Sequence, residues 1–297
     1  KMQLLFGASL QSNGTSSIFA SGTGYTNDVL MSSTNNAPTK FVINNNGDYK
    51  YAALFGRINY NLKNKYIVNL NVRRDGSSRF GPGRQYGSFG SIGAAWIFSE
   101  ANWIKKNLAF LSFGKIRASY GLTGGDQIAD YSFLSQWTFP NSLYNGSIPL
   151  VATRHTDSLL QWQVNKKFEI SFNLGFFNDR FNIEANWYQN RCNNQLVQFP
   201  TPSLTGFTDV VSNSPANIQN RGYELLFSGK VLENRSLKWE VKFNLSSNRN
   251  KLISYPNFSQ SPYVSQYTIG KSLNIVKVLH YTGVSPQDGL YQFDDKN

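Results

Sequence analysis

The chain has 297 residues, a formal net charge of +12 and only 15% charged residues, beside 15% aromatic ones, whereas soluble proteins carry about 25% charged residues. The sequence contains no run of about 18 apolar residues, which excludes membrane-spanning helices. The 29 Lys and Arg residues are dispersed rather than clustered, which argues against nucleic-acid binding. One cysteine, Cys192, and two distant histidines, His155 and His280, exclude a disulfide framework and argue against a metal enzyme, so we expect neither a metal site nor a cofactor.

Taken in chain order, one segment after another alternates apolar and polar residues. The clearest are 52–62, 66–73, 116–123, 168–176 and 237–246. In 66–73, for example, the even positions are Tyr, Val, Leu and Val, and three of the four odd positions are Asn, Asn and Arg. Successive side chains of a strand point to opposite faces, so each segment predicts a strand with one apolar and one polar face.

A soluble β-sandwich would show the same alternation, and three further features favour a membrane barrel. The segments run to about 9–13 residues, the length that crosses a bilayer at a barrel tilt. Aromatic residues recur near their ends, as at Trp96, Trp187 and Trp239, where a barrel has its interfacial girdles. The polar face carries charged residues, which a sandwich core would not accept unpaired.

The connections between these segments alternate in length. The sequence predicts long ones at 12–49, 74–86, 124–165, 196–220 and beyond about 250, short ones at 63–65, 178–180 and 232–236, and an intermediate one at 99–111. Long loops on one side and short turns on the other are typical of outer-membrane barrels. We therefore expect an all-β fold, an antiparallel transmembrane β-barrel, with about ten strands forming an arc of a larger barrel of about 22 strands. Residues 1–297 would form part of one barrel domain, with the plug domain and closing strands outside this chain.

The ten residues 73–82, RRDGSSRFGP, resemble the signature of SusC/RagA-type TonB-dependent outer-membrane transporters. Further motifs of that family follow in order over roughly residues 50–295, among them GAAW at 93–96, KIRASYG at 115–121, GFFNDR at 175–180, NRGYE at 220–224 and GVSPQDG at 283–289.

The resemblance implies import of oligosaccharides or peptides across the bacterial outer membrane, driven through TonB by an N-terminal plug outside this chain. It also implies contact with outer-membrane lipid, a SusD-like surface lipoprotein as partner, dimers of transporter–lipoprotein pairs, and no catalytic residue. An outer-membrane barrel enzyme of the protease or lipase type, a passive porin and a soluble adhesive sandwich remain alternatives.

Two groups of residues are candidates for the site. The signature residues are expected to form a charge-paired loop that staples the strand ends, with direct substrate contact as the alternative: Arg73, Arg74, Asp75, Gly76, Arg79 and Phe80. Aromatic residues of the long loop 124–165 could stack on a sugar or peptide, although part of them would only pack the loop: Tyr131, Phe133, Trp137 and Tyr144. The acids Asp126, Asp130 and Asp157 lack the spacing of a calcium loop and are expected to be solvated.

Overall fold

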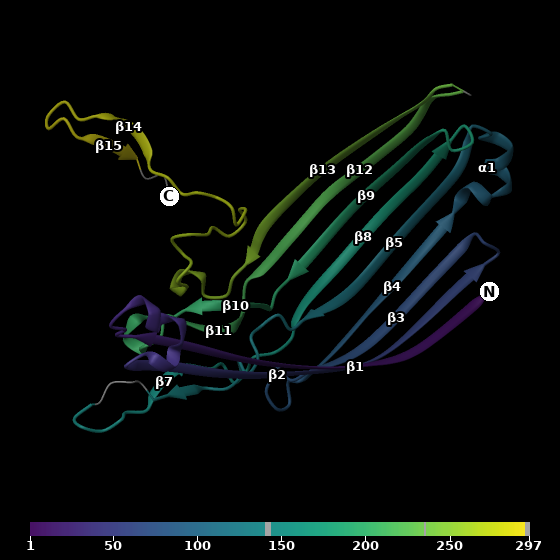
Figure 1. Cartoon of the computed structure of the whole chain (residues 1–297). Coiled ribbons are helices and arrows are strands. Elements are labelled where there is room, and N and C mark those ends of the chain that lie inside the picture. The colour runs from purple at the N-terminus through teal and green to yellow at the C-terminus, as the bar shows by residue number, and fades with distance from the viewer. Residues whose placement is uncertain (140–143, 235, 295–297) are drawn as a thin grey trace.

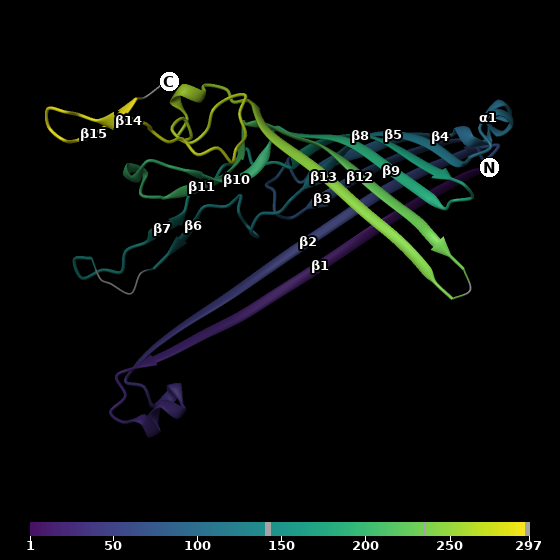
Figure 2. The ribbon, with the colours of Figure 1, turned by 90° about the horizontal axis from the view of Figure 1, so that it is seen from above.

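The computed structural model describes residues 1–139, 144–234 and 236–294. Nine strands of this described part form one sheet in the order β1-β2-β3-β4-β5-β8-β9-β12-β13, with every neighbouring pair antiparallel. They are β1 (Met2–Thr23), β2 (Thr39–Leu62), β3 (Tyr66–Ser77), β4 (Tyr86–Ile97), β5 (Leu111–Gly125), β8 (Gln163–Phe176), β9 (Phe181–Cys192), β12 (Asn217–Glu233) and β13 (Lys238–Ser254). The predicted all-β, antiparallel fold is confirmed, and the open, curved sheet is an arc rather than a closed barrel (Figures 1 and 2).

The remaining elements are small. Three two-stranded hairpins pair β6 (Gln136–Thr138) with β7 (Val151–Arg154), β10 (Gln195–Pro200) with β11 (Asp209–Ser214), and β14 (His280–Val284) with β15 (Tyr291–Asp294). The helices are α1 (Asn102–Asn107) and the 3-10 turns η1 (Asp28–Ser32), η2 (Thr34–Asn36), η3 (Phe98–Glu100), η4 (Ser203–Thr205) and η5 (Phe258–Gln260). Within the described residues, no helix has both the length and the apolar character needed to cross a membrane.

Long and short connections lie at opposite ends of the sheet (Figure 1). The hairpins and the turns η1 and η2 gather at one end, which we call the loop end, and the tight turns after β2, β8 and β12 lie at the other, with α1. The tight turns use left-handed backbone, with positive φ at Lys63, Asn64, Asn178 and Asp179. The predicted long–short alternation is confirmed, and the 99–111 stretch contains α1 and all but the first residue of η3.

The expectation of a long loop at 12–49 was wrong. Strands β1 and β2 stay paired from Met2↔Tyr60 up to Thr23↔Thr39, so the connection proper is only 24–38. Residues 11–23 lack an apolar–polar alternation, and residues 11–20 are exposed on both faces. The backbone ladder continues there without an amphipathic pattern, and the hairpin projects well past the other strands (Figure 2).

The cross-strand register sorts the side chains into two faces. Residues directly opposite each other point to the same side of the sheet. From β1 to β8 one such row joins Leu4, Ile58, Leu70, Ile92, Tyr120 and Phe168, and it continues on β9, β12 and β13 as Gln189, Arg221 and Arg249. The neighbouring row, on the other face, joins Leu5, Arg57, Asn71, Ser91, Gly121, Lys167, Asn190 and Asn220. The apolar face is open rather than sealed inside the protein, since Leu70, Tyr120 and Phe243, which all lie on it, are 40%, 46% and 54% exposed.

The apolar face has the height of a bilayer. It begins at the row Leu62–Tyr66–Trp96 and ends at the row Ala52–Gly76–Tyr86, with ten residue steps between them on β2. At about 3.3 Å per residue this is roughly 33 Å of strand, and a tilt of about 40° reduces it to roughly 25 Å, the height of the apolar band of an outer-membrane barrel. Tyr66 and Trp96 stack at 6.4 Å at one border of the band, and Tyr86 lies at the other.

The buried core lies at the loop end. One cluster comprises Phe80, Phe89, Leu160 and Trp162, and a second comprises Ala216, Ile218, Leu252 and Tyr255. Both join loop residues to strand ends, so the tertiary core of this chain fixes the loops on the rim of the sheet.

Candidate functional site

The polar face of the sheet is hollowed. A depression of about 730 Å³ extends from Ser91 on β4 to Asn248 on β13 and is lined mostly by polar side chains, among them Arg117, Lys167 and Glu169. Arg117 Nη2 lies 2.7 Å from Glu169 Oε1, and both side chains are more than two-fifths exposed. A concave wall of amides, hydroxyls and screened ion pairs can offer hydrogen bonds to a polar solute without burying unpaired charge.

Two residues of the signature, Arg73 and Asp75, lie on this polar side. Arg73 donates from Nε to Asp75 Oδ1 at 2.5 Å and from Nη2 to the Tyr51 hydroxyl, and its guanidinium stacks over the Tyr51 and Phe55 rings. Asp75 is buried, so this ion pair supplies the counter-charge that a buried carboxylate requires. The pair fixes β3 to β2 just before the signature turn.

Arg79 connects the signature turn to the long loop after β5. Its Nε lies 2.9 Å from Asp130 Oδ1, its Nη1 donates to the Asp126 carbonyl at 3.1 Å, and its guanidinium stacks 4.2 Å above the Tyr49 ring. The Asp126 carboxylate in turn accepts from the Tyr49 hydroxyl at 2.9 Å and from Ser77 Oγ at 2.7 Å. Burial, together with this hydrogen bond to the Asp126 carboxylate, raises the pKa of Tyr49 to about 12. We call Tyr49, Ser77, Arg79, Asp126 and Asp130 the rim cluster.

Phe80 adds an apolar anchor to the rim cluster. It is fully buried, with its ring 5.1 Å from Trp162, which also meets Phe89 at 5.5 Å. The Trp162 indole donates to the Gln85 carbonyl at 3.0 Å, so the buried ring leaves no unpaired polar group. The turn between β3 and β4 therefore packs directly on the segment that leads into β8.

The four candidate aromatic residues divide into two pairs. Tyr131 and Phe133 are half-buried. The Tyr131 hydroxyl accepts from the Asp48 backbone N–H at 3.1 Å, and Phe133 lies over Gly81, where an added Cβ would stand 3.2 Å from its ring. Trp137 and Tyr144 are 59% and 77% exposed, and they are the members of the set that remain free to meet a ligand.

The loop acids are partnered, not solvated, which corrects the expectation from the sequence. Asp126 and Asp130 belong to the rim cluster, and Asp157 Oδ2 accepts from Ser212 Oγ at 2.6 Å. His155 is exposed and stacks on Phe207 at 5.7 Å. Among residues 1–139, 144–234 and 236–294, no group of three or more His, Cys, Asp or Glu side chains is placed to hold a metal ion.

The sequence did not reveal that Tyr49 and Trp162 contact the signature residues Arg79 and Phe80. Tyr49 lies in a stretch assigned to a loop, and neither residue belongs to the signature, so no motif marked them as its partners. Arg73 and Arg74 were also expected to share one role. The period of two would have separated them, because adjacent strand residues face opposite sides, and Arg74 lies on the apolar face in the row of Leu54 and Ser88.

Comparison with known proteins agrees with this architecture. The family model described as TonB dependent receptor-like, beta-barrel matches residues 2–282. The chain belongs to this family. It is 29% identical over 246 residues to TonB-dependent receptor P39 of Formosa agariphila, covering 83% of this chain and 23% of that protein. It is 26% identical over 219 residues to TonB-dependent receptor SusC of Bacteroides thetaiotaomicron, covering 70% and 21%.

Among solved structures, the RagAB peptide transporter superposes with a TM-score of 0.84 at 24% identity, covering 98% of this chain and 33% of that one. This likeness shows a shared barrel fold. The predicted resemblance to SusC/RagA-type proteins is confirmed. The chain spans between a fifth and a third of the length of these proteins.

Proposed function

We propose that this chain forms an arc of the barrel wall of a TonB-dependent importer of oligosaccharides or peptides in the bacterial outer membrane. The observation that carries the proposal is the pairing of an apolar face about one bilayer high with a hollowed polar face lined by Arg117, Lys167 and Glu169. In an aqueous sandwich the apolar side would lie in the protein interior. Here it is open across the sheet, as a lipid-facing wall requires.

The free edges of the sheet support an arc within a larger domain. Strands β1 and β13 each pair on one side only within the described residues, and lipid offers no partner for the remaining N–H and C=O groups. We propose that further strands of the same barrel domain continue from both edges, giving about 22 strands, and that a plug in the lumen couples transport to TonB.

The loop end provides the solute entrance in this proposal. The rim cluster and Phe80 would hold the 126–162 loop in place as a staple, while the exposed Trp137 and Tyr144 would stack on sugar rings or peptide side chains. A SusD-like lipoprotein would cover this mouth, and two such pairs would associate. An oligosaccharide and a peptide are the two solute classes to test, and the RagAB structure is that of a peptide transporter.

The test uses cells that carry the full-length protein, with a deletion strain as control. Labelled oligosaccharide and peptide pools are offered before and after an uncoupler collapses the proton gradient, and an affinity tag on the barrel is used to search for a co-purifying lipoprotein. The proposal predicts uptake of one pool that requires both the protein and the gradient.

Other outcomes identify the alternatives. Uptake that persists after the uncoupler would indicate a passive porin, and conversion of the solute without entry would indicate a surface enzyme. Absence of any uptake that depends on the protein, across both pools, would refute the importer.

A further inference from the structure

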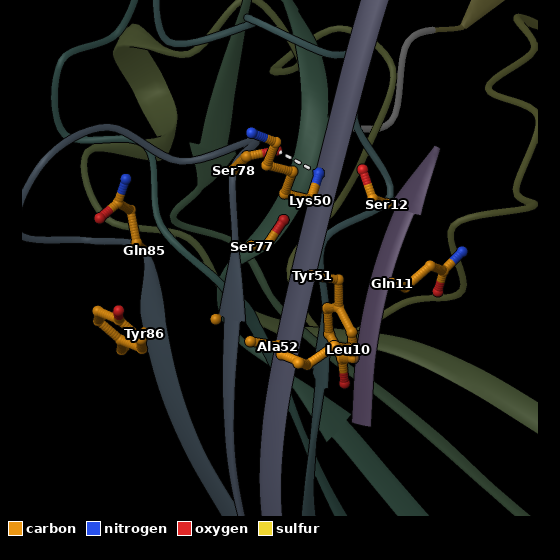
Figure 3. Close-up of a pocket in the computed structure, with 11 residues that line it drawn as sticks. Leu10, Gln11, Ser12, Lys50, Tyr51, Ala52, Ser77, Ser78, Gln85 and Tyr86 are labelled. Atoms are coloured by element: carbon orange, nitrogen blue, oxygen red, sulfur yellow. Dashed lines mark hydrogen bonds between the residues drawn. The ribbon is translucent and has the colours of Figure 1, made fainter. Parts of the chain in front are cut away.

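Two adjoining hollows lie on the apolar face of β1–β4, just where this face gives way to polar residues. The upper one, of about 480 Å³, has Leu10, Ala52, Gly76 and Tyr86 in one register row and Lys50 above them. Figure 3 shows Lys50, Ser12 and Ser78 towards one end and Leu10, Ala52 and Tyr86 towards the other. The small residues make it hollow: a Cβ on Gly76 would stand 2.8 Å from the Tyr86 ring.

The lower hollow, of about 570 Å³, continues towards the middle of the apolar band. On this face it is lined by Phe6, Leu54, Gly56 and Val72, with Arg74 at its upper border. Phe6 and Val72 flank Gly56, since a Cβ there would meet both at 3.5–3.6 Å. An apolar chain can occupy such a groove, because it replaces lipid contacts with equivalent protein contacts.

Two cations border these hollows without a counter-ion. Lys50 and Arg74 are exposed, and neither takes part in an ion pair among the residues that the structure describes. Arg74 stacks 5.5 Å from the Tyr86 ring, and the Lys50 backbone N–H donates to Ser78 Oγ at 2.9 Å. On this face of the four strands and the 78–85 turn, Asp48 is the one carboxylate, two residues above Lys50 and likewise outside every ion pair.

The position of the two cations and the distance between them fit a head group with two phosphates. Four residues along β2 separate Lys50 from Leu54, the cross-strand partner of Arg74, or roughly 13 Å at about 3.3 Å per residue. A head group with two phosphates can place one phosphate at each of these side chains. The hydroxyls of Ser12 and Ser78 suit the sugar part of such a head group.

We infer that this groove binds a phosphorylated glycolipid of the outer leaflet, of the lipid A class, with an acyl chain over Val72 and phosphates at Arg74 and Lys50. The inference rests on the proposed membrane location, because the loop end then faces outward and the groove lies at head-group level. It gives Arg74 a role distinct from that of Arg73 and Arg79, which bind carboxylates of this chain.

The test measures lipid retention by the full-length protein in nanodiscs of defined composition, by native mass spectrometry. Lipid A is compared with dephosphorylated lipid A, phosphatidylglycerol and phosphatidylethanolamine. The double variant Lys50→Ala with Arg74→Gln is compared with Arg57→Ala with Lys115→Ala, two exposed or half-buried cations of the opposite face. A difference in migration on SDS gels between unheated and boiled samples confirms that each barrel is folded.

The expected result is a preference of the wild type for lipid A, a loss of retained lipid A on the order of tenfold in the first double variant, and no change in the second. Equal retention by both double variants, or equal retention of dephosphorylated lipid A or of phosphatidylglycerol by the wild type, would overturn the inference. Solute uptake is scored separately. If the wild type takes up solute but the Lys50–Arg74 double variant retains as much lipid A as the wild type, only the lipid site is refuted. If the wild type selects lipid A but takes up no solute, only the importer is refuted.

Discussion

Replacing Arg79 by alanine is expected to release the 126–162 loop from the rim of the barrel. The substitution removes the 2.9 Å contact to Asp130, the 3.1 Å bond to the Asp126 carbonyl and the stacking on Tyr49. The Arg79 and Asp130 side chains are each about a quarter exposed, so solvent weakens the ion pair relative to a buried one. We estimate about 1 kcal/mol for each hydrogen bond and about 0.5–1 kcal/mol for the stacking, or about 2–3 kcal/mol in total.

Amide hydrogen exchange in the full-length protein measures this effect directly. A loss of about 2 kcal/mol accelerates exchange roughly thirtyfold at amides that open with the loop, such as those of Ile128 and Leu134. Arg79→Lys keeps the charge but lacks the planar guanidinium, so its exchange rate is expected to lie between those of the wild type and Arg79→Ala. Arg84→Ala is the matched control, because Arg84 makes one exposed hydrogen bond, to Gln161, and its loss should change exchange less than fivefold. Equal protection in Arg79→Ala and wild type would refute the staple.

Three further predictions concern the same end of the barrel. Phe80→Ala should lower the unfolding free energy by about 3–5 kcal/mol in urea titrations of the refolded full-length barrel, and a loss below about 1 kcal/mol would mean that its ring is not buried. The pKa of Tyr49 is raised to about 12, so the protonated phenol stabilises the fold below its ordinary pKa of about 10, and this stability is lost as the pH rises from 10 to 12. The melting temperature of the wild type should therefore fall in this window more than that of Tyr49→Phe. Identical pH profiles of the two proteins would contradict the assignment. Trp137→Ala with Tyr144→Ala should weaken solute binding about tenfold or more in calorimetric titrations while leaving the melting temperature unchanged, whereas lowered stability with intact binding would assign both rings to packing.

The strands within the apolar band could be predicted from the sequence because one physical cause produces both pattern and structure. Lipid on one side and water on the other impose alternation on 66–73 and 168–176. Tight turns use residues such as Asn64 and Asn178 that tolerate positive φ. Above the band this cause is absent. Residues 11–20 are exposed on both faces, and the strand over 11–23 follows only from pairing with 39–51.

The site was predictable in its residues but not in its partners. The motif identified Arg73, Asp75, Arg79 and Phe80, yet the roles of Tyr49 and Asp126 depend on the path of a long loop, which no periodicity specifies. The acids of this loop were expected to be solvated for the same reason. Only folding brings residue 49 next to residue 126, where one carboxylate accepts two hydroxyl donors.

The orientation of the sheet in the membrane is the claim on which the other conclusions depend, and a pair of adjacent substitutions tests it. Leu70 lies in a row near the middle of the apolar band, and Asn71 lies next to it on the polar face. With lipid outside the barrel, Leu70→Arg should lower the unfolding free energy of the full-length protein in bilayers by about 2–4 kcal/mol, and Asn71→Arg should change it by less than about 1 kcal/mol. Equal effects, or a larger loss from Asn71→Arg, would contradict the account.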